Sequence, residues 1–340
     1  MSGELSSRKA QHLRLTLEGD VGFATLTTGL DDVRVMPRAL PERDLEDVDL
    51  SVQRWGRRLA APLLISCMTG GTSQAGAVNA ALAVAAQQHR VGLGLGSGRV
   101  LLEDSSAAGF AVRDLAPDAL VLANLGAVQL HQYRAEDCRR LVELCQADGL
   151  VLHLNAVQEA VQPGGDTAYA GLLERIAGVC ERLDVPVIVK EVGFGLSPDD
   201  VAALASAGVA GVDVAGAGGT NWAAVEGLRD PAAGGVAAAF RDWGLPTADA
   251  VAAAREALDG LAAADLVLIG SGGLRHGVDA LKVLCLGADI AGIARGFLAA
   301  AAEGTDAATA AVGAVCRQLR IAAWAAGAAT PADLTSALLQ

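Results

Sequence analysis

Residues 149–159 read Gly-Leu-Val-Leu-His-Leu-Asn-Ala-Val-Gln-Glu, and a turn-rich Gln-Pro-Gly-Gly-Asp follows at residues 162–166. The first part is a continuous apolar run after a glycine, which predicts a parallel strand covered on both faces. The polar residues His153, Asn155, Gln158 and Glu159 crowd at its carboxyl end. Ligands bind at this end of the strands in parallel α/β folds. The stretch therefore predicts a site, the alternative being that these groups only cap the strand and its loop.

Strands of the same kind recur before and after this stretch and alternate with helical segments. We expect them at residues 62–68, 91–97, 119–123, 186–189, 210–214, 265–269 and 288–293. Helices are expected up to residue 88, over 135–147 and 168–183, and from residue 197 onward. Eight strand-helix units predict an α/β fold, a (β/α)8 TIM barrel, for which about 250 residues is typical.

The chain has 340 residues, so segments outside the barrel must account for the excess. We expect an irregular amino-terminal arm over residues 1–60 and the barrel over residues 61–304. A glycine-rich insertion at residues 221–244 is a candidate lid. Carboxyl-terminal helices would occupy residues 305–340, the last beginning at the capping signal Thr330-Pro331.

Composition excludes several classes of protein. The net charge of −13 argues against nonspecific nucleic-acid binding, although a few local cations can still hold an anionic substrate. No apolar run approaches the roughly 18 residues that span a membrane, and the charged first twenty residues are unlike a secretory signal. We therefore expect a cytoplasmic protein without membrane contact. The six cysteines form no CxxC pair, which predicts reduced, packed thiols.

The predicted strand ends form a ring of polar and glycine residues above an apolar barrel. Glycine-rich loops after the last three strands let backbone N–H groups approach a phosphate, although glycines also form ordinary tight turns. Lys190 would be costly to bury alone, so it pairs with an anion or an electron-rich ring, or with Glu159 or Glu191. Glu159 suits magnesium, which usually takes one or two protein carboxylates. Arg8, Lys9 and His12 form a cationic helix face near the amino terminus.

These motifs, in this order, resemble those of the type 2 isopentenyl-diphosphate isomerases from residue 8 to residue 334. The motifs after two of the strands, which contain Gln158-Glu159 and Lys190-Glu191, are specific, whereas the loop at residues 271–273 recurs in many flavin barrels. The resemblance is carried by Arg8-Lys9-x-x-His12, Met68-Thr69-Gly70-Gly71, Gly96-Ser97-x-Arg99, Asn124-Leu125-Gly126-Ala127, His153-Leu154-Asn155-x-x-Gln158-Glu159, Val189-Lys190-Glu191-Val192-Gly193, Asp213-Val214-x-Gly216-x-Gly218-Gly219-Thr220 and Ser271-Gly272-Gly273-x-Arg275.

The resemblance implies an FMN enzyme that interconverts isopentenyl and dimethylallyl diphosphates, with Mg²⁺, and with NADPH as the flavin reductant. It also implies a homo-oligomer, a tetramer or an octamer. Glu159 would bind the metal, and Gln158 and Lys190 would be catalytic. The diphosphate would be held by Arg8, Lys9, Arg99, His153 and Asn155, with Gln158 facing the alkene. FMN would lie against Cys67, Met68, Thr69, Ser97, Asn124, Lys190, Thr220, Gly272, Gly273, Ala294 and Arg295.

Three positions depart from the family pattern. Gly164 stands where Glu is often found, and Ala215 where a Ser often contacts FMN. Each of these losses removes one polar contact, typically worth about 1 kcal/mol. Cys67 replaces the Ala that commonly precedes Met-Thr, which places a thiol close to the flavin.

The reaction moves a double bond without net redox, and Gln158 has no proton that titrates in the useful range. We therefore hypothesise that reduced FMN is itself the acid and base through N5, with Lys190 stabilising its negative charge. One alternative is an FMN barrel that transfers hydride, against which the chain has no His-Gly-Gly-Arg motif and no catalytic cysteine loop. Another is a degenerate barrel that acts as a binding or scaffold protein.

Overall fold

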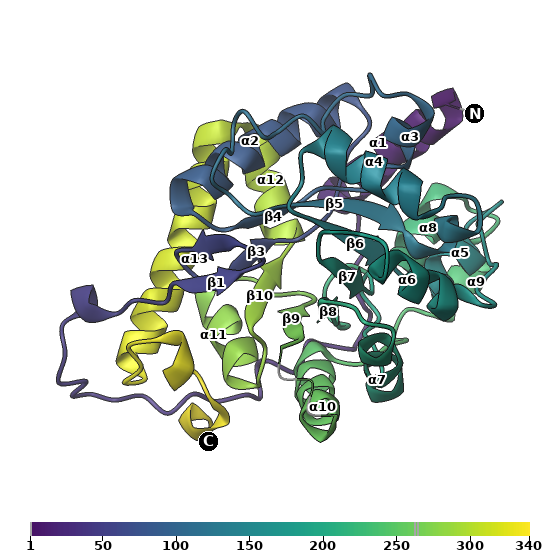
Figure 1. Cartoon of the computed structure of the whole chain (residues 1–340). Coiled ribbons are helices and arrows are strands. Elements are labelled where there is room, and N and C mark those ends of the chain that lie inside the picture. Colours follow the sequence, from purple (N-terminus) through teal and green to yellow (C-terminus); the bar gives the residue numbers. More distant parts are fainter. Residues whose placement is uncertain (1, 262, 264) are drawn as a thin grey trace.

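The computed structural model describes residues 2–261, 263 and 265–340, so Met1 of the predicted arm lies outside the described residues. A closed barrel of eight parallel strands forms its centre, as predicted (Figure 1). Neighbouring strands follow one another along the chain, and β10 pairs with β3 to close the sheet. The strands are β3 (Leu63–Ile65), β4 (Gly92–Gly94), β5 (Val121–Gly126), β6 (Gly149–His153), β7 (Val187–Lys190), β8 (Gly211–Asp213), β9 (Val267–Ser271) and β10 (Ile290–Ile293).

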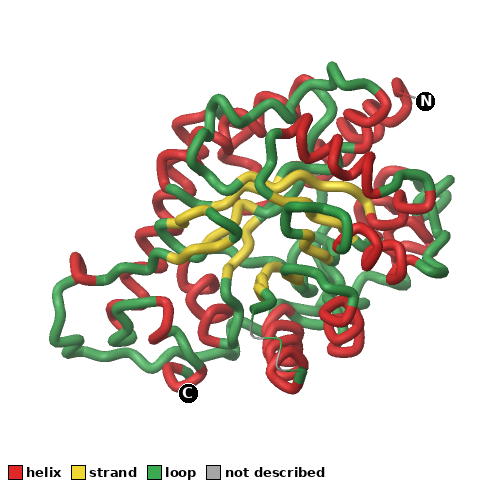
Figure 2. Tube along the Cα trace, viewed as in Figure 1, coloured by secondary structure: helices red, strands yellow, loops and turns green. Residues whose placement is uncertain are grey.

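Helices surround the barrel, and strand and helix alternate around the ring (Figure 2). The long α13 packs against α2, α11 and α12 on the side of the barrel where the sheet closes. The helices are α1 (Ser2–Glu18), α2 (Ser73–His89), α3 (Arg99–Glu103), α4 (Ala135–Cys145), α5 (Ala156–Val161), α6 (Leu172–Cys180), α7 (Pro198–Ser206), α8 (Trp222–Arg229), α9 (Gly234–Ala238), α10 (Thr247–Gly260), α11 (Gly277–Cys285), α12 (Arg295–Glu303) and α13 (Thr305–Ala325).

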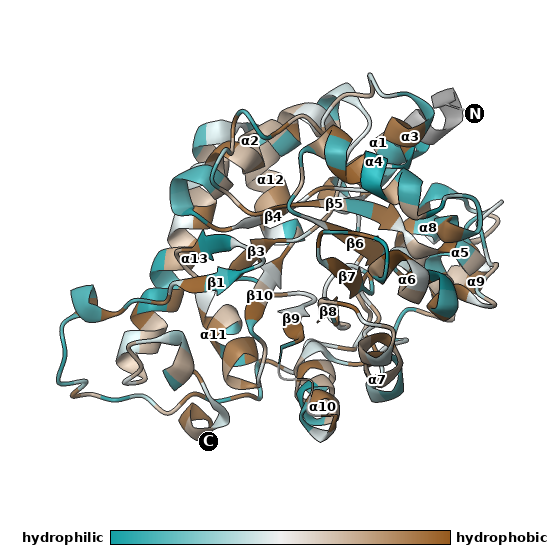
Figure 3. Cartoon of the chain, viewed as in Figure 1, coloured by the Kyte–Doolittle hydropathy of each residue, from teal (hydrophilic) through white to brown (hydrophobic). Residues whose placement is uncertain are grey.

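Sequence signals explain both the strands and the helix starts. Most strand residues are aliphatic and fully buried, as expected for strands covered on both faces, and β9 and β10 carry the hydrophobic colour in Figure 3. At the start of α7 the Ser197 hydroxyl accepts a hydrogen bond from the Asp200 N–H, and Pro198 occupies the first helical position. The predicted helix from residue 197 is thereby confirmed.

A hairpin closes the amino-terminal end of the barrel, within the arm that we expected to be irregular. It consists of β1 (Val52–Arg54) and β2 (Arg57–Leu59), which pair antiparallel. Trp55 and Gly56 turn the chain with φ of 47° and 78°, the double positive φ that a two-residue hairpin turn requires. The hairpin packs against the apolar residues that fill the barrel interior, among them Leu122, Ile188 and Ile269. The arm is therefore part of the core.

Two segments outside the barrel strands take defined structures. The glycine-rich insertion at residues 221–244 contains α8 and α9, whose alanines pack with Val161 and Phe194 in a small apolar cluster, and its role as a lid stays a prediction. The signal at Thr330 starts a helix, as expected, but a short one. Its capping box with Asp333 begins a single 3-10 turn, Pro331–Asp333, because Leu334 leaves the helical region (φ −80°, ψ 78°).

The helix predicted over residues 168–183 is shorter than expected, since α6 begins at Leu172. The segment before it, which includes Tyr169, is a turn that folds back onto the end of β6. A helix that was not expected, α5, follows β6 directly. Both differences concern the loop that carries the polar residues of the opening stretch.

Within the described residues, no helix is both long enough and apolar enough to cross a membrane.

Replacing Leu59 by Ala tests the closing role of the hairpin. Leu59 is 1% exposed, so the substitution should lower the free energy of unfolding by about 2–5 kcal/mol, as buried Leu→Ala changes do. Urea denaturation followed by circular dichroism measures the change. Arg58→Ala, on the same strand but with its side chain 60% exposed, is the matched control. A loss below about 1 kcal/mol in Leu59→Ala would mean that the hairpin is not part of the core.

Candidate active site

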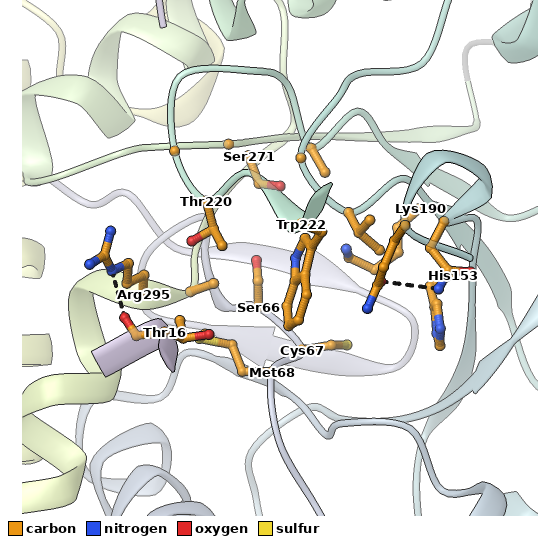
Figure 4. Close-up of a pocket in the computed structure, with 18 of the residues that line it drawn as sticks. Thr16, Ser66, Cys67, Met68, His153, Lys190, Thr220, Trp222, Ser271 and Arg295 are labelled. Carbon is orange, nitrogen blue, oxygen red and sulfur yellow. Dashed lines mark hydrogen bonds between the residues drawn. The ribbon is translucent and has the colours of Figure 1, made fainter. Parts of the chain in front are cut away.

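A cavity of about 810 Å³ opens over the carboxyl ends of the strands. Residues from the strand ends line it together with residues of α1, which lies far away in the sequence. Figure 4 shows Lys190, Thr220, Trp222 and Met68 around this space. The structure brings every residue that was predicted for the site into its lining: Arg8, Lys9, Cys67, Met68, Thr69, Ser97, Arg99, Asn124, His153, Asn155, Gln158, Glu159, Lys190, Thr220, Gly272, Gly273, Ala294 and Arg295.

Helix α1 supplies cations to one side of the cavity. Lys9 Nζ donates a hydrogen bond to the Ser97 carbonyl oxygen at 2.8 Å and lies 5.8 Å from the centre of the Phe110 ring. Burial, assisted by the nearby charge of Arg8, lowers the pKa of Lys9 to about 8. An anion beside Lys9 would reverse this shift, because it favours the charged form. The geometry is therefore that of a site prepared for a negative ligand.

Two basic residues from neighbouring strands occupy the floor of the cavity. His153 and Lys190 are register partners on β6 and β7. His153 Nδ1 lies 2.8 Å from the amide oxygen of Asn124, and burial, with the charge of Lys190, lowers the pKa of His153 to about 3. His153 is therefore neutral at physiological pH. Lys190 is 7% exposed, and its ammonium donates to the backbone carbonyl oxygen of Glu191.

The salt bridge that was considered for Lys190 does not form. Within the described part of the chain, no carboxylate oxygen lies within 4 Å of its ammonium. The Glu191 carboxylate instead accepts hydrogen bonds from the N–H groups of Gly193, Phe194 and Gly195. Burial raises the pKa of Glu191 to about 7, against the effect of those hydrogen bonds. Lys190 is thus directed at the cavity rather than at a fixed anion.

Helix α5 brings Gln158 and Glu159 together with Asn155. The Asn155 side-chain amide donates to Gln158 Oε1 at 3.1 Å and to Glu159 Oε1 at 3.0 Å, which fixes both side chains. The other oxygen of Glu159 accepts from the Asp166 N–H at 2.8 Å. No group of three His, Cys, Asp or Glu side chains suited to a metal occurs in the residues the structure describes. A metal here would rely on Glu159, water and the ligand, an arrangement that magnesium accepts.

Glu226, which the sequence did not single out, is a fully buried carboxylate of α8. Gln158 Nε2 donates to Glu226 Oε1 at 2.9 Å, and His12 Nε2 lies 2.9 Å from the same oxygen. Arg229 Nε donates to the other oxygen at 2.7 Å. Burial acts to raise the pKa of Glu226, but the hydrogen bonds and charges of these partners outweigh it, and the pKa falls to about 2. An ionised Glu226 therefore fixes the amide of Gln158.

A signal for one of these neighbours existed in the sequence. Arg8, His12 and Thr16 recur every four residues, so they lie on one face of α1 and all three line the cavity. Glu226 had no such signal, since it is one polar residue in the glycine-rich insertion at residues 221–244. Its role depends on the helix that buries it.

Glycines form the opposite wall of the cavity. Gly218, Gly272 and Gly273 have φ of 112°, 114° and 69°, and a Cβ on Gly273 would lie 2.6 Å from a Thr28 methyl group. Only glycine fits such a close approach of backbone segments, and glycine-rich loops of this kind let backbone N–H groups reach an anion. Arg295, at the start of α12, donates from Nε to the Thr16 carbonyl oxygen at 3.0 Å (Figure 4). It thereby joins α1 to this wall.

Cys67 lies beyond the end of β3 and lines the cavity. A Cβ on Gly94, on the neighbouring strand, would lie 2.5 Å from its sulfur, so the thiol fills the space that the glycine leaves. Burial raises the pKa of the Cys67 thiol, although Lys190 acts in the opposite direction. The thiol is therefore protonated at neutral pH.

The fold of the barrel is that of flavin enzymes. The flavin-binding domain of baker's yeast flavocytochrome b2 is 19% identical, with a TM-score of 0.69 and a coverage of 100% of this chain and 85% of that one. A mandelate oxidase with a monooxide FMN adduct is 20% identical, with a TM-score of 0.68 and 96% of both chains covered. These similarities establish the fold alone.

Sequence similarity is much closer to another group of enzymes. Isopentenyl-diphosphate delta-isomerase of Xanthobacter autotrophicus is 51% identical over 326 residues, 95% of this chain and 94% of the relative. The enzyme of the same name from Stutzerimonas stutzeri is 47% identical over 340 residues, 98% and 97% of the two chains. The family model of the FMN-dependent dehydrogenases matches residues 101–340. The chain therefore belongs to the isopentenyl-diphosphate delta-isomerases, within the FMN-dependent dehydrogenase family.

Proposed function

We propose that this protein interconverts isopentenyl and dimethylallyl diphosphates, with reduced FMN and Mg²⁺ bound in the cavity. The observation that carries the proposal is that Gln158, the cations of α1 and the glycine wall all line one cavity. The cations suit a diphosphate, and the glycine wall suits the phosphate of a cofactor. The curated relatives support this reading, since they carry the name isopentenyl-diphosphate delta-isomerase.

The glycine wall and the strand ends would hold FMN. A Cβ on Gly272 would collide with Gly216, and one on Gly273 with Thr28 and Gly218, so the two glycines let these loops pack closely beside the cavity, where backbone N–H groups could face a phosphate. Reduced FMN, when bound, would supply the acid and base through its N5. Lys190 would stabilise negative charge on the ring. The other contacts are assigned to Cys67, Met68, Thr69, Ser97, Asn124, Thr220, Ala294 and Arg295.

The diphosphate would lie against Arg8, Lys9 and Arg99, with its metal on Glu159. Lys9 is largely protonated below its pKa of about 8, so diphosphate affinity should be greatest in neutral solution and fall at higher pH. His153, which was also predicted to hold the diphosphate, is neutral before the ligand binds. It would gain a proton only if the anion raised its pKa against the effect of burial. Asn155 would act mainly by holding Gln158 and Glu159, because its amide hydrogens are already donated to them.

Gln158 would orient the alkene. Its oxygen accepts from Asn155 and its amide nitrogen donates to Glu226, so the side chain is held at both ends. An unactivated alkene is a poor base, and protonation of a carbon requires the donor and the double bond to be aligned. Trp222, Phe23 and Leu26 line the same cavity and would exclude water from the reacting carbons. The protein thus supplies position and a dry environment.

The proposal also covers the flavin reductant, the cellular location and the oligomeric state. We expect NADPH to keep the flavin reduced, and the chain to act in the cytoplasm as a homo-oligomer of four or eight copies. Large apolar side chains exposed on several elements favour association. Val236 and Trp243, near α9, are 57% and 56% exposed, and Ile321 of α13 is 39% exposed.

Hydride transfer is the second candidate, since the matching family model describes FMN-dependent dehydrogenases. A base that removes a proton during hydride transfer works best with a pKa near neutrality. His153, the histidine on the cavity floor, has its pKa lowered to about 3. Lys190 is already hydrogen-bonded to the Glu191 carbonyl oxygen. The site is thus less suited to hydride transfer than to isomerisation.

Proton NMR of isopentenyl diphosphate in deuterated water, with FMN, Mg²⁺ and dithionite, tests the reaction. We expect dimethylallyl diphosphate that carries deuterium, and none in a control without reductant. Stoichiometric oxidation or reduction of the flavin by the substrate would instead support hydride transfer. If FMN binds and no conversion occurs, the assignment is wrong.

Gly273→Ala should weaken FMN binding by roughly tenfold or more, because its methyl group would displace the loop that contains Gly218. Gly171→Ala is the matched control. Its φ of 71° is close to the 69° of Gly273, but a Cβ there meets nothing within 4 Å. Gly171→Ala should lose about 1–2 kcal/mol because of its positive φ alone, and Gly273→Ala should lose more because its methyl group also meets Thr28 and Gly218. Equal FMN affinity of the two variants, measured by quenching of flavin fluorescence, would contradict a phosphate site at this wall.

Glu159→Gln should raise the Mg²⁺ concentration needed for half-maximal conversion by about tenfold or more, since a neutral amide binds the cation less tightly than a carboxylate. The FMN affinity should stay unchanged. Glu143→Gln, an identical change at an exposed position of α4, is the control. An unchanged Mg²⁺ requirement in Glu159→Gln would exclude Glu159 as the metal ligand.

A further inference from the structure

Asp213 is a buried carboxylate that neither the proposed mechanism nor the cavity lining includes. It is the last residue of β8 and is 2% exposed. Its Oδ1 accepts hydrogen bonds from the Ser271 hydroxyl at 2.6 Å and from the Ala215 N–H at 3.2 Å. A distance of 2.6 Å between a hydroxyl oxygen and a carboxylate oxygen is typical of a hydrogen bond to an ionised carboxylate. Burying such a charge is costly unless an opposite charge lies nearby.

The strand register identifies that opposite charge. His153, Lys190 and Asp213 are register partners on β6, β7 and β8, so they form one row across the barrel wall. Register partners on adjacent strands are about 5 Å apart and point to the same side of the sheet. Lys190 thus has a neutral histidine on one side and a carboxylate on the other. Burial raises the pKa of Asp213, and the attraction of Lys190 opposes that rise.

Asp213 does not form a direct ion pair with Lys190. The Lys190 ammonium donates to the Glu191 carbonyl oxygen, and within the described residues no Lys or Arg nitrogen lies within 4 Å of the Asp213 carboxylate. Ser271 lines the cavity while Asp213 does not, which puts the carboxylate behind the layer that a ligand contacts. The two charges therefore attract each other electrostatically without a direct contact. The Lys190 ammonium can still interact with a ligand in the cavity.

We propose that Asp213 is a positioning residue that acts on the flavin site through its charge, as the counter-ion of Lys190. Its negative charge offsets the buried positive charge of Lys190 before a ligand binds. It also reduces the positive field that Lys190 exerts on the ring. This inference rests on the proposed FMN site. It goes beyond that site because Asp213, which does not contact the flavin, would influence the midpoint potential of the bound flavin.

The first test compares Asp213→Asn with Ser271→Ala. The asparagine keeps the shape and the acceptor oxygen but removes the charge, whereas Ser271→Ala removes the hydrogen bond and keeps the charge. Removing the negative charge should favour the anionic reduced flavin. The ratio of its affinity to that of oxidised FMN should rise by roughly tenfold in Asp213→Asn, a shift of the midpoint potential of about 30 mV for two electrons.

Ser271→Ala should change this ratio by less than about threefold. A redox titration of the bound flavin measures both variants against the unmodified protein. An unchanged potential in Asp213→Asn, or an equal shift in both variants, would overturn the proposal. If the unmodified protein does not bind FMN at all, the proposed function fails first, and that result is seen before any variant is made.

The second test needs no flavin and covers the case in which Asp213→Asn folds poorly. Lys190→Met leaves Asp213 as an unpaired buried charge and should lower the melting temperature. In that background Asp213→Asn should restore part of the loss, because it removes the uncompensated charge. Additive losses in the double variant, or a double variant that does not fold, would show that the two charges do not stabilise one another.

Discussion

Hydrogen bonding between β3 and β10 closes the sheet, and the site depends on that closure. Ala291, Gly292 and Ile293 pair with Leu63, Leu64 and Ile65, segments that lie more than half the chain apart. Since all eight strands are parallel, closure brings eight loops to one end. A polar side chain at the end of any strand therefore faces the others without a long loop of its own. The apolar interior and the hairpin at the other end keep this geometry rigid.

The arrangement buries several charged side chains, and most of them are stabilised by hydrogen bonds or opposite charges around them. Glu226 is fully buried, yet Gln158, Arg229 and His12 surround it and keep it ionised. Glu191 is offset by three backbone N–H groups. Among the residues that the structure describes, no carboxylate oxygen lies within 4 Å of Lys9 Nζ, and burial, with the charge of Arg8, lowers the pKa of Lys9. The cations that face the cavity thus have fewer opposite charges near them than the buried carboxylates have. An anionic ligand would supply the missing negative charge.

The barrel could be predicted from the sequence because each strand is a short apolar run with its own boundaries. All eight predicted strands are present, with ends displaced by a few residues. The site residues followed from this result, since they stand at strand ends. Segments whose structure is set by tertiary contacts could not be predicted. The hairpin turn has Trp55 where Asn, Asp or Gly is usual, and the hairpin is stabilised by the barrel interior that it covers. Helices α8 and α9 are rich in alanine and glycine and are held by packing.

Tertiary contacts also explain why the motifs predicted which residues line the cavity but not the protonation or the hydrogen bonds of those residues. His153 was expected to bind a diphosphate, a role that favours a charged imidazole, but burial beside Lys190 makes it neutral. Asn155 was expected to contact the substrate, but its amide is occupied by Gln158 and Glu159. In both cases the residue lies where the motif placed it, and a neighbour from another element decides its protonation or orientation. Motif order therefore defines which groups meet in the cavity. Their state is set by buried neighbours such as Glu226 and Asp213, which only the folded chain brings next to them.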